Sequence, residues 1–326
     1  MGLKAGTLAA MGAASLCLNV AQAQPPQQPP PLFVWAAKPT TLTPYVAPHR
    51  PHTKLADVLA RHRGQASWSE VVVNDNQMRG EYIQMTPGQK TKTQLLADQR
   101  HGFIVWDGQL KVTIKGQEPF VATKGYMVQV PFRVPYSLEV VGDKPALRFE
   151  VKPVYAATEY LADETPPPPE SGTTWQRVRV TESDTYERQK SSPYLDFFAA
   201  ANSATPPRGS FMSDDRGFMN IVRQRGIPQQ PDYVKGHFHV NYGEFWFIME
   251  GQVGYKIEGL DYFVAEPGDI VYAAAGRYHR AQSTGTGMGT RIPLNGFPYG
   301  AHHYDPDEPP APRPPQPAGA AAPPTR

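Results

Sequence analysis

The sequence contains an internal repeat. Its turn glycines recur at a fixed offset, which is the separation between Gly108 and Gly251. Gly108 in WDGQLKV aligns with Gly251 in MEGQVGY, and Gly125 in KGYMVQVP aligns with Gly268 in PGDIVYAA. The spacing between the two glycines is the same in each copy, and each copy places strand-like segments around them. A repeat this long, without drift in register, indicates duplication of a whole domain rather than of a short solenoid unit. We therefore expect two consecutive domains of one fold.

Both halves read as short strands separated by Gly, Pro and Asp turns, which is typical of β-sandwiches and barrels. Proline supplies 36 of 326 residues, about twice the usual share, and this excludes helical bundles and helical repeats. We expect two short helices, one at 54–62 capped by Thr53 and one at 194–204. The expected strands lie at 80–85, 103–106, 110–114, 126–130, 138–141, 245–249, 254–257 and 270–272.

Three proline-rich segments, at 25–31, 165–170 and 308–326, divide the chain. They cannot bury a core, so we interpret them as flexible linkers, with ligands for partner domains as the alternative. The predicted organisation is a signal peptide at 1–23, a Pro-rich N-terminal linker at 24–52, a first domain at 53–160, a Pro-rich linker at 161–173, a second domain at 174–304 and a Pro/Ala-rich tail at 305–326.

The amino-terminal segment 1–23 has the pattern of a cleavable signal peptide. Lys4 is followed by an apolar stretch at 5–20 and a small-residue cleavage site at 21–23. The apolar stretch is too short to span a membrane comfortably. Cys17, the one cysteine, lies inside this segment, so the mature protein has neither a disulfide nor a thiolate metal site. We expect a periplasmic or secreted protein.

The charge balance restricts the kind of partner. Lys and Arg number 32 against 30 Asp and Glu, for a formal charge of +2, and there is no basic run. This argues against a nucleic-acid partner. Beyond the leader no segment has the long apolar run that a transmembrane helix needs, so we expect no membrane span. The expected partner is a small-molecule substrate, and a homo-oligomer is left open.

Residues 236–251, GHFHVNYGEFWFIMEG, concentrate metal-binding side chains. His237 and His239 are two positions apart, so on a strand they point the same way. Glu244 follows after a turn, and His279 ends a later strand-like segment. Two imidazoles from one strand, a carboxylate from the next and an imidazole from a distant strand can surround one divalent transition metal inside a barrel.

These residues resemble the two cupin motifs, H-x-H-(x)4-E-(x)6-G and G-(x)5-P-x-G-x-x-H. The resemblance covers both halves, so the chain is similar to bicupins: an all-β protein with two cupin-type β-barrels (double-stranded β-helix or jelly roll) in tandem and a few short helices. It implies that one divalent metal (Fe, Mn, Cu, Ni or Zn) is held by His237, His239, Glu244 and His279. Ala274 stands where the second motif has Pro, and Pro231 where the first opens with Gly. Neither position is a ligand.

In the first half the corresponding ligand positions are Gln94, Leu96, His101 and Tyr136. Leucine cannot bind a metal, and glutamine and tyrosine bind poorly at neutral pH. We therefore predict a degenerate, metal-free barrel that packs against the second barrel or closes its mouth. The alternative is a metal-free pocket that binds a ligand through Arg133, Tyr136 and His101.

Alternation along the strand after Glu244 predicts which side chains face the second barrel's interior. Trp246 and Ile248 should point inward, and Phe245 and Phe247 outward. As polar and aromatic groups of the pocket we name catalytic Glu244, Arg277 and Tyr278, and substrate-binding Trp246, Tyr242 and Tyr272.

Four further residues near the carboxyl terminus are considered as site residues. Arg291 and Asn295 could reach the rim of the barrel, but the sequence does not place them. We expect His302 and His303, beside the tail, to be surface residues.

A site of three histidines and one glutamate leaves coordination positions open for a substrate and for O₂. We therefore predict a metal-dependent oxygenase of dioxygenase type acting on a small oxygenated or phenolic compound, with Glu244 as ligand or general base. A decarboxylase, lyase or isomerase is the alternative, and so is a non-enzymatic small-molecule-binding cupin. Bicupins resembling oxalate decarboxylases usually keep ligands in both barrels, which weighs against that activity here. The motif indicates the fold and not the reaction.

Overall fold

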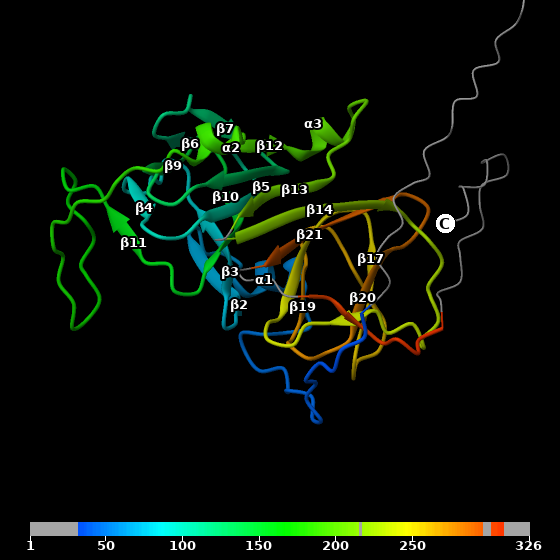
Figure 1. The fold of residues 1–326 in the computed structure, drawn as a ribbon. Coiled ribbons are helices and arrows are strands. Elements are labelled where there is room, and N and C mark those ends of the chain that lie inside the picture. The colour runs from blue at the N-terminus through cyan, green and yellow to red at the C-terminus, as the bar shows by residue number, and fades with distance from the viewer. Residues whose placement is uncertain (1–31, 215–216, 296–300, 310–326) are drawn as a thin grey trace, which may run out of the picture. The chain divides into compact units, whose positions relative to one another are not determined.

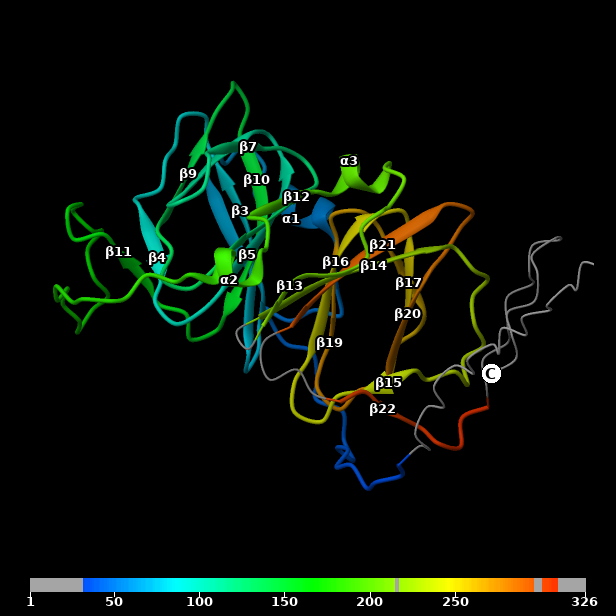
Figure 2. The same cartoon turned by 45° about the horizontal axis from the view of Figure 1, so that its top comes forward.

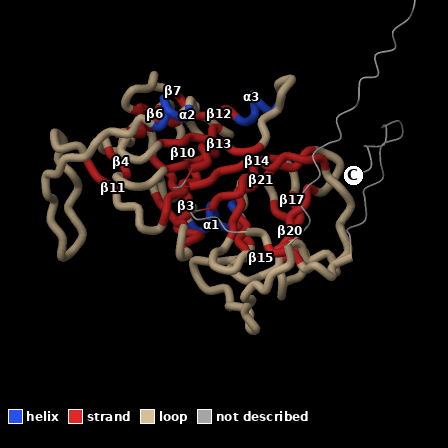
Figure 3. The backbone as a smooth tube through the Cα atoms, in the orientation of Figure 1, coloured by secondary structure: helices blue, strands red, loops and turns tan. Residues whose placement is uncertain are grey.

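Each half of the chain folds into two antiparallel sheets, and helices are few (Figures 1 and 3). The structure is a computed structural model that describes residues 32–214, 217–295 and 301–309. Residues from Ala36 onward form one unit and are described together. The expected all-β class is confirmed. Within the described ranges, no helix is long and apolar enough to cross a membrane.

The first half contains a six-stranded and a five-stranded sheet. The larger has the order β12-β8-β5-β10-β3-β2, formed by β2 (Trp68–Asn74), β3 (Met78–Met85), β5 (His101–Asp107), β8 (Tyr126–Val130), β10 (Ala146–Pro153) and β12 (Tyr194–Asp196). The smaller has the order β11-β4-β9-β6-β7, formed by β4 (Gln94–Leu96), β6 (Leu110–Ile114), β7 (Phe120–Ala122), β9 (Tyr136–Val140) and β11 (Thr158–Tyr160).

The second half has the same two kinds of sheet. The larger has the order β1-β19-β16-β21-β14-β13, formed by β1 (His52–Thr53), β13 (Gly209–Asp214), β14 (Gly217–Arg225), β16 (Glu244–Glu250), β19 (Ile270–Ala273) and β21 (Met288–Asn295). The smaller has the order β18-β17-β20-β15-β22, formed by β15 (His237–Phe238), β17 (Val253–Ile257), β18 (Phe263–Ala265), β20 (His279–Ser283) and β22 (His303–Tyr304).

The order of equivalent strands is identical in the two halves, so the sequence repeat is a repeat of fold. It holds at the level of single pairs: Gln94 lies opposite Tyr136, and His237 lies opposite His279. The offset that relates Gly108 to Gly251 also relates these two pairs. The predicted duplication of a whole domain is therefore confirmed.

Strand β16 divides its side chains between two apolar cores. Trp246 and Ile248 belong to the core of the second half, whereas Phe245 and Phe247 pack in the core between the halves. This is the alternation predicted from the sequence. The Phe247 ring lies 5.7 Å from the ring of Phe149 on β10 of the first half. Burial of one such ring contributes about 1.5–3 kcal/mol, so apolar contact holds the halves together.

Each half also supplies an edge strand to the other (Figure 2). β1 precedes the sheets of the first half and pairs with β19 of the second, while β12 precedes the sheets of the second half and pairs with β8 of the first. The exchange covers two sheet edges that would otherwise present unpaired backbone groups. The domain limits at 53–160 and 174–304 remain a prediction.

Asp269, in the turn before β19, makes hydrogen-bond contacts with three groups where β1 pairs with β19. Its Oδ2 lies 2.7 Å from His52 Nε2 and accepts the Glu266 N–H at 3.0 Å. Its Oδ1 accepts the N–H of Leu55, the first residue of α1, at 3.0 Å. Asp269 is buried, so these contacts replace the water that the carboxylate gives up on folding.

The first expected helix is shorter than predicted and is capped differently. Helix α1 spans Leu55–Arg61, and Thr53 lies in β1 instead of capping the helix. The position before α1 is Lys54, whose side chain makes no capping hydrogen bond. Asp269 takes that role from the other half of the chain, which the local sequence could not indicate.

The second expected helix, at 194–204, was wrong over its first turn. That turn is strand β12, because the edge of β8 supplies backbone partners that override local helix preference. Helix α3 follows at Phe197–Ala201, and Asp196 Oδ1 accepts the Ala199 N–H at 3.0 Å. A further helix, α2, spans Thr185–Gln189 and was not predicted.

We expect Asp269→Ala to lower the free energy of unfolding by about 2–4 kcal/mol, because the half-buried His52 and two backbone donors lose their acceptor. Urea unfolding followed by circular dichroism measures this change. Asp261→Ala removes an exposed carboxylate from the nearby turn and should stay within about 0.5 kcal/mol of the parent. Equal losses in the two variants would contradict the role given to Asp269.

Candidate metal centre

Three strands begin at the residues singled out by the sequence: β15 at His237, β16 at Glu244 and β20 at His279. Gly236, before β15, has a φ of +84°. A Cβ at this position would collide with the carbonyl oxygen of His279. Glycine therefore permits β15 to approach β20 closely, and this places His237 opposite His279.

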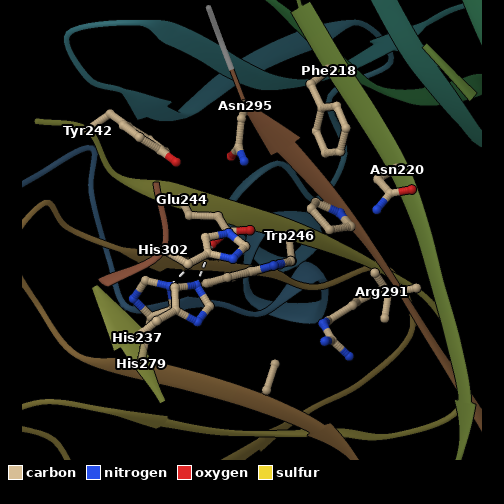
Figure 4. Close-up of a pocket in the computed structure, with 13 residues that line it drawn as sticks. Phe218, Asn220, His237, Tyr242, Glu244, Trp246, His279, Arg291, Asn295 and His302 are labelled. Atoms are coloured by element: carbon tan, nitrogen blue, oxygen red, sulfur yellow. Dashed lines mark hydrogen bonds and ion pairs between the residues drawn. The ribbon is translucent and has the colours of Figure 1, made fainter. Parts of the chain in front are cut away.

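The four predicted ligands meet at one point. His237, His239, Glu244 and His279 each offer one ligand atom, and these atoms lie within 4.8 Å of one another. Figure 4 shows His237, Glu244 and His279 at this point. Glu244 Oε2 is 3.0 Å from His239 Nε2, 3.2 Å from His279 Nε2 and 3.6 Å from His237 Nε2. His237 is half-buried and the other three are buried.

The outer contacts of two rings show that the site fits a metal. His279 Nδ1 lies 2.9 Å from the carbonyl oxygen of Arg277, and His239 Nδ1 lies 3.3 Å from that of Ala301. A carbonyl only accepts, so Nδ1 is the donor in each contact and Nε2 of each ring points towards Glu244. Imidazole nitrogens and a carboxylate oxygen that converge in this way form a donor set that suits a divalent transition metal.

Electrostatics keep these groups ready to bind. Burial raises the pKa of the Glu244 carboxyl, but its contacts with the three imidazoles outweigh burial and hold the pKa well below its usual range. Burial lowers the pKa of the His237 imidazole. Metal ligands must be an ionised carboxylate and neutral imidazoles, and both shifts favour those forms.

The ligands face a cavity of about 410 Å³, a size suited to a small organic molecule. Trp246 lies in the wall, and the ring of Tyr242 stacks on His239 with centroids 4.3 Å apart. Both were predicted as substrate-binding residues, and that role remains a prediction. Besides His237, Glu244 and His279, the lining consists of Phe218, Asn220, Val222, Tyr242, Trp246, Ala281, Arg291, Pro293, Asn295 and His302.

Two polar side chains of β21 line the cavity without partners. Arg291 Nη1 and Asn295 Oδ1 are shielded from solvent, and neither has a hydrogen-bond partner among the described residues. Burial lowers the pKa of the Arg291 guanidinium, whereas the nearby Tyr255 and Glu244 raise it. From the sequence, Arg291 and Asn295 were considered as residues that could reach the rim, without a definite position. A buried donor left unpaired costs about 1–3 kcal/mol, which points to an interaction made with a ligand.

Arg277 was predicted to be catalytic, but the described lining of the cavity does not include it. Its Nη1 donates to the Glu258 carbonyl at 2.5 Å and its Nη2 to the Thr43 carbonyl at 2.6 Å. The prediction assumed strand alternation from His279, but β20 begins only at that residue. Arg277 lies in the preceding turn, so its side chain holds backbone segments together.

Tyr278 and Tyr272 also lie outside the described lining. The Tyr278 ring packs 5.0 Å from Phe238 and lies beneath the ammonium of Lys38 at 5.2 Å. The Tyr272 ring belongs to the core between the halves, 4.8 Å from His49. The structure therefore brings neither phenol to the cavity.

His302 was expected at the surface, and it is exposed. It also lines the cavity, with its ring 4.1 Å from that of His237 and 5.0 Å from that of His239, which the sequence did not indicate. The next residues form β22, which pairs with β15 and so brings the carboxyl-terminal segment to the site. His302 has no fixed spacing from the motif, so the sequence carried no signal for this placement.

In the first half, the equivalent positions bind one another. Gln94 Nε2 donates to the Tyr136 hydroxyl at 2.9 Å, and His101 Nε2 lies 3.2 Å from Glu150 Oε1. Arg148 Nε donates to Glu150 Oε2 at 2.9 Å. The group of metal-ligating side chains found among the described residues lies in the second half. The metal-free state of the first barrel stays a prediction.

The alternative of a ligand pocket in the first half stays a prediction. Tyr136 is bonded to Gln94, and the guanidinium carbon of Arg133 lies 4.7 Å above the Phe132 ring. Both ring nitrogens of His101 and Nε of Arg133 are buried without a hydrogen-bond partner among the described residues. Burial raises the pKa of Glu150, but the charges of His101 and Arg148 outweigh burial and hold the pKa far below its usual range.

His239→Ala and His279→Ala are expected to abolish metal binding, because each removes one of four converging ligand atoms. His101→Ala, at the position equivalent to Glu244, should leave the metal content unchanged. Elemental analysis of proteins purified without chelator measures the metal-to-chain ratio. Loss of metal in His101→Ala would overturn the assignment of the site to the second half.

The depressed pKa of Glu150 predicts an acid-sensitive contribution to stability. The folded pKa lies below the unfolded value of 4.5, so the contribution is complete above pH 4.5 and is lost as pH falls further. We expect Glu150→Gln to be less stable than the parent at pH 7 and to lose less stability between pH 5 and pH 3. Urea midpoints across this range test the slope, with exposed Glu118→Gln as the control. Parallel curves for the parent and Glu150→Gln would contradict it.

Comparisons with known proteins find similarity in structure. No family model matches the chain, and no curated protein matches its sequence. A cupin 2 conserved barrel domain protein from Leptotrichia buccalis is similar at a TM-score of 0.49 and 11% identity, over 75% of this chain and 95% of that chain. A mutant of Bacillus subtilis oxalate decarboxylase OxdC is similar at 0.46 and 12% identity, over 81% of each chain. A structure of that enzyme concerned with its Mn(II) centres is similar at 0.43 and 12% identity, over 73% and 74%.

The fold of this chain follows from its own strand order and site geometry. Both halves repeat the same two-sheet arrangement, and the residues that match the cupin motifs gather at one point. The chain therefore consists of two consecutive domains of one two-sheet fold, and the ligand residues of the predicted metal motif are complete in the second domain and replaced in the first.

Proposed function

We propose that this protein is a divalent-metal-dependent oxygenase of dioxygenase type that acts on a small oxygenated or phenolic compound. The observation that carries the proposal is the convergence of three imidazole nitrogens and one carboxylate oxygen within 4.8 Å beside the cavity. A structural metal site is normally closed on all sides, whereas this one faces a space that can admit a substrate.

One set of residues would hold the metal, and another set forms the wall of the cavity. His237, His239, Glu244 and His279 would hold the ion, and the carbonyl contacts of His239 and His279 orient their rings. A bound divalent metal polarises a substrate oxygen and lowers its pKa, and a redox-active metal also supplies electrons for reaction with O₂. The apolar wall, including Phe218 and Trp246, limits water around the reacting group.

Glu244 is the proposed proton acceptor for a substrate hydroxyl. Among the described residues that line the cavity it is the sole carboxylate. Its depressed pKa makes it a weak base while it contacts three imidazoles, so proton transfer requires those contacts to loosen. Ligand and base are therefore competing roles for one side chain.

Metal-dependent decarboxylation is the second candidate, and Arg291 is the observation that favours it. A buried guanidinium with an unpaired nitrogen suits an anionic substrate, and decarboxylation requires a carboxylate. Activity towards carboxylic acids without O₂ consumption would favour this candidate.

Export is part of the proposal. Its support is the sequence pattern of residues 1–23, which lie outside the described residues. A chain that folds outside the cytoplasm takes up metal from its surroundings, and affinity then favours copper or zinc over manganese or iron. Recovery of the exported protein beginning at Gln24 would support cleavage at the predicted site.

Elemental analysis of the exported protein, with O₂ uptake measured on a panel of phenols, tests the proposal. We expect about one iron, manganese, copper or nickel ion per chain and O₂ consumption that His279→Ala abolishes. Stoichiometric zinc without O₂ uptake would redirect the assignment to decarboxylase, lyase or isomerase chemistry. Absence of stoichiometric metal in the parent would overturn the enzyme proposal in favour of a binding protein.

A further inference from the structure

Arginine occupies the same place in both barrels. Arg148 on β10 lies opposite Val105 of β5, and Arg291 on β21 lies opposite Ile248 of β16. The offset of the sequence repeat relates the two arginines, and it also relates Val105 to Ile248. Each arginine belongs to the inward row of its strand, since the alternate residues belong to the core between the halves. The comparison of their surroundings is therefore a comparison of equivalent positions.

In the first barrel this arginine has a carboxylate partner from its own strand. Arg148 Nε donates to Glu150 Oε2 at 2.9 Å, and its Nη2 lies 2.9 Å from the same oxygen. The other oxygen, Oε1, lies 3.2 Å from Nε2 of His101. His101 stands where the second barrel has the metal ligand Glu244. One buried carboxylate thus bridges the arginine and the position of a metal ligand.

In the second barrel the position equivalent to Glu150 offers no carboxylate. The counterpart of Glu150 is Pro293, which lies opposite Trp246 as Glu150 lies opposite Phe103. Proline has no side-chain acceptor. Arg291 Nη1 is buried with no hydrogen-bond partner, and no carboxylate of the described residues lies within ion-pair distance of this guanidinium. The cavity borders Arg291 and Pro293 alike.

We infer that Arg291 binds a carboxylate of the ligand, which takes the place that the Glu150 carboxylate has beside Arg148. The ligand class is a small organic acid whose carboxylate lies at Arg291 and whose second oxygen points towards the metal ligands. This inference rests on the proposed function, because it places the acid in the same cavity. Asn295 Oδ1, also buried and unpaired, adds an acceptor suited to a hydroxyl group of the acid.

A carboxylate fits this position better than a phosphate. The internal example in the first barrel is a carboxylate held by one guanidinium. A phosphate carries more charge, and the cavity offers one arginine while Glu244 adds a negative charge to the same wall. A monoanion is therefore the better match for the charge of the site.

Binding of paired acids and amides to zinc-loaded protein tests the inference. The probes are 3-hydroxypropanoate and 4-hydroxybenzoate, each compared with its neutral amide by titration calorimetry. We expect each acid to bind about tenfold or more tightly than its amide, since a charge-assisted hydrogen bond to a buried guanidinium is lost in the amide. Arg291→Met should remove this preference. Arg223→Met, which removes a cation paired with Glu250 on the neighbouring strand, should retain it.

Pro293→Glu provides the converse experiment. It places a carboxylate two positions after Arg291, in the spacing that Glu150 has from Arg148. We expect this variant to keep its metal and to lose acid binding, because its own carboxylate occupies the guanidinium. Should Pro293→Glu fail to fold, Arg291→Lys serves as the second variant, and it should keep part of the acid preference that Arg291→Met loses.

The outcomes separate this inference from the proposed function. A metal-loaded parent that binds acids and amides equally, or binds neither acid, would overturn the inference and leave the metal centre intact. An acid preference that persists in Arg291→Met would overturn it as well. A parent without metal would refute the proposed function. The anion site would still be testable in that metal-free protein, because it predicts a preference for acids over amides that Arg291→Met removes.

Discussion

The structure depends on the two faces of one strand. β16 turns Phe245 and Phe247 into the core shared by the halves, and it turns Glu244 and Trp246 towards the cavity. A shift of one residue in its pairing would exchange these sets, burying a carboxylate among aromatic rings and exposing the rings. The apolar contact between the halves therefore enforces the register that aims Glu244 at the histidines. Cohesion of the fold and geometry of the site are consequences of the same alternation.

The two barrels differ in how their buried charged groups are paired. Charged groups inside a barrel must be paired, because an isolated buried charge is costly. The first barrel pairs Glu150 with Arg148 and His101 from within the chain. The second gathers three imidazoles around Glu244, and Arg291 Nη1 has no hydrogen-bond partner among the described residues, which suits groups that arrive from solution. The first barrel is thus complete as a folded structure, whereas the second is arranged for binding.

Residues whose relation is local were predictable. His237 begins β15, His239 follows directly after that strand, and Glu244 begins β16, so the short fixed spacing of the motif relates the three residues. His279 could be added because the repeat and the second motif give its spacing. Arg277 illustrates the limit of reasoning from strand alternation, since it lies in the turn before β20 and its side chain bonds to backbone carbonyls.

The sequence by itself determined the duplicated β-fold, the complete ligand set of the second half and the loss of that set in the first. These follow from composition, periodicity and spacing, which are properties of the chain read in order. The tertiary structure decided that Asp269 caps a helix of the other half and that His302 reaches the cavity through the pairing of β22 with β15. It also decided that Arg291 Nη1 is shielded from solvent and that, among the described residues, no carboxylate pairs with it as Glu150 pairs with Arg148. Such contacts join residues far apart in the chain, and they arise only when packing of the sheets brings those residues together.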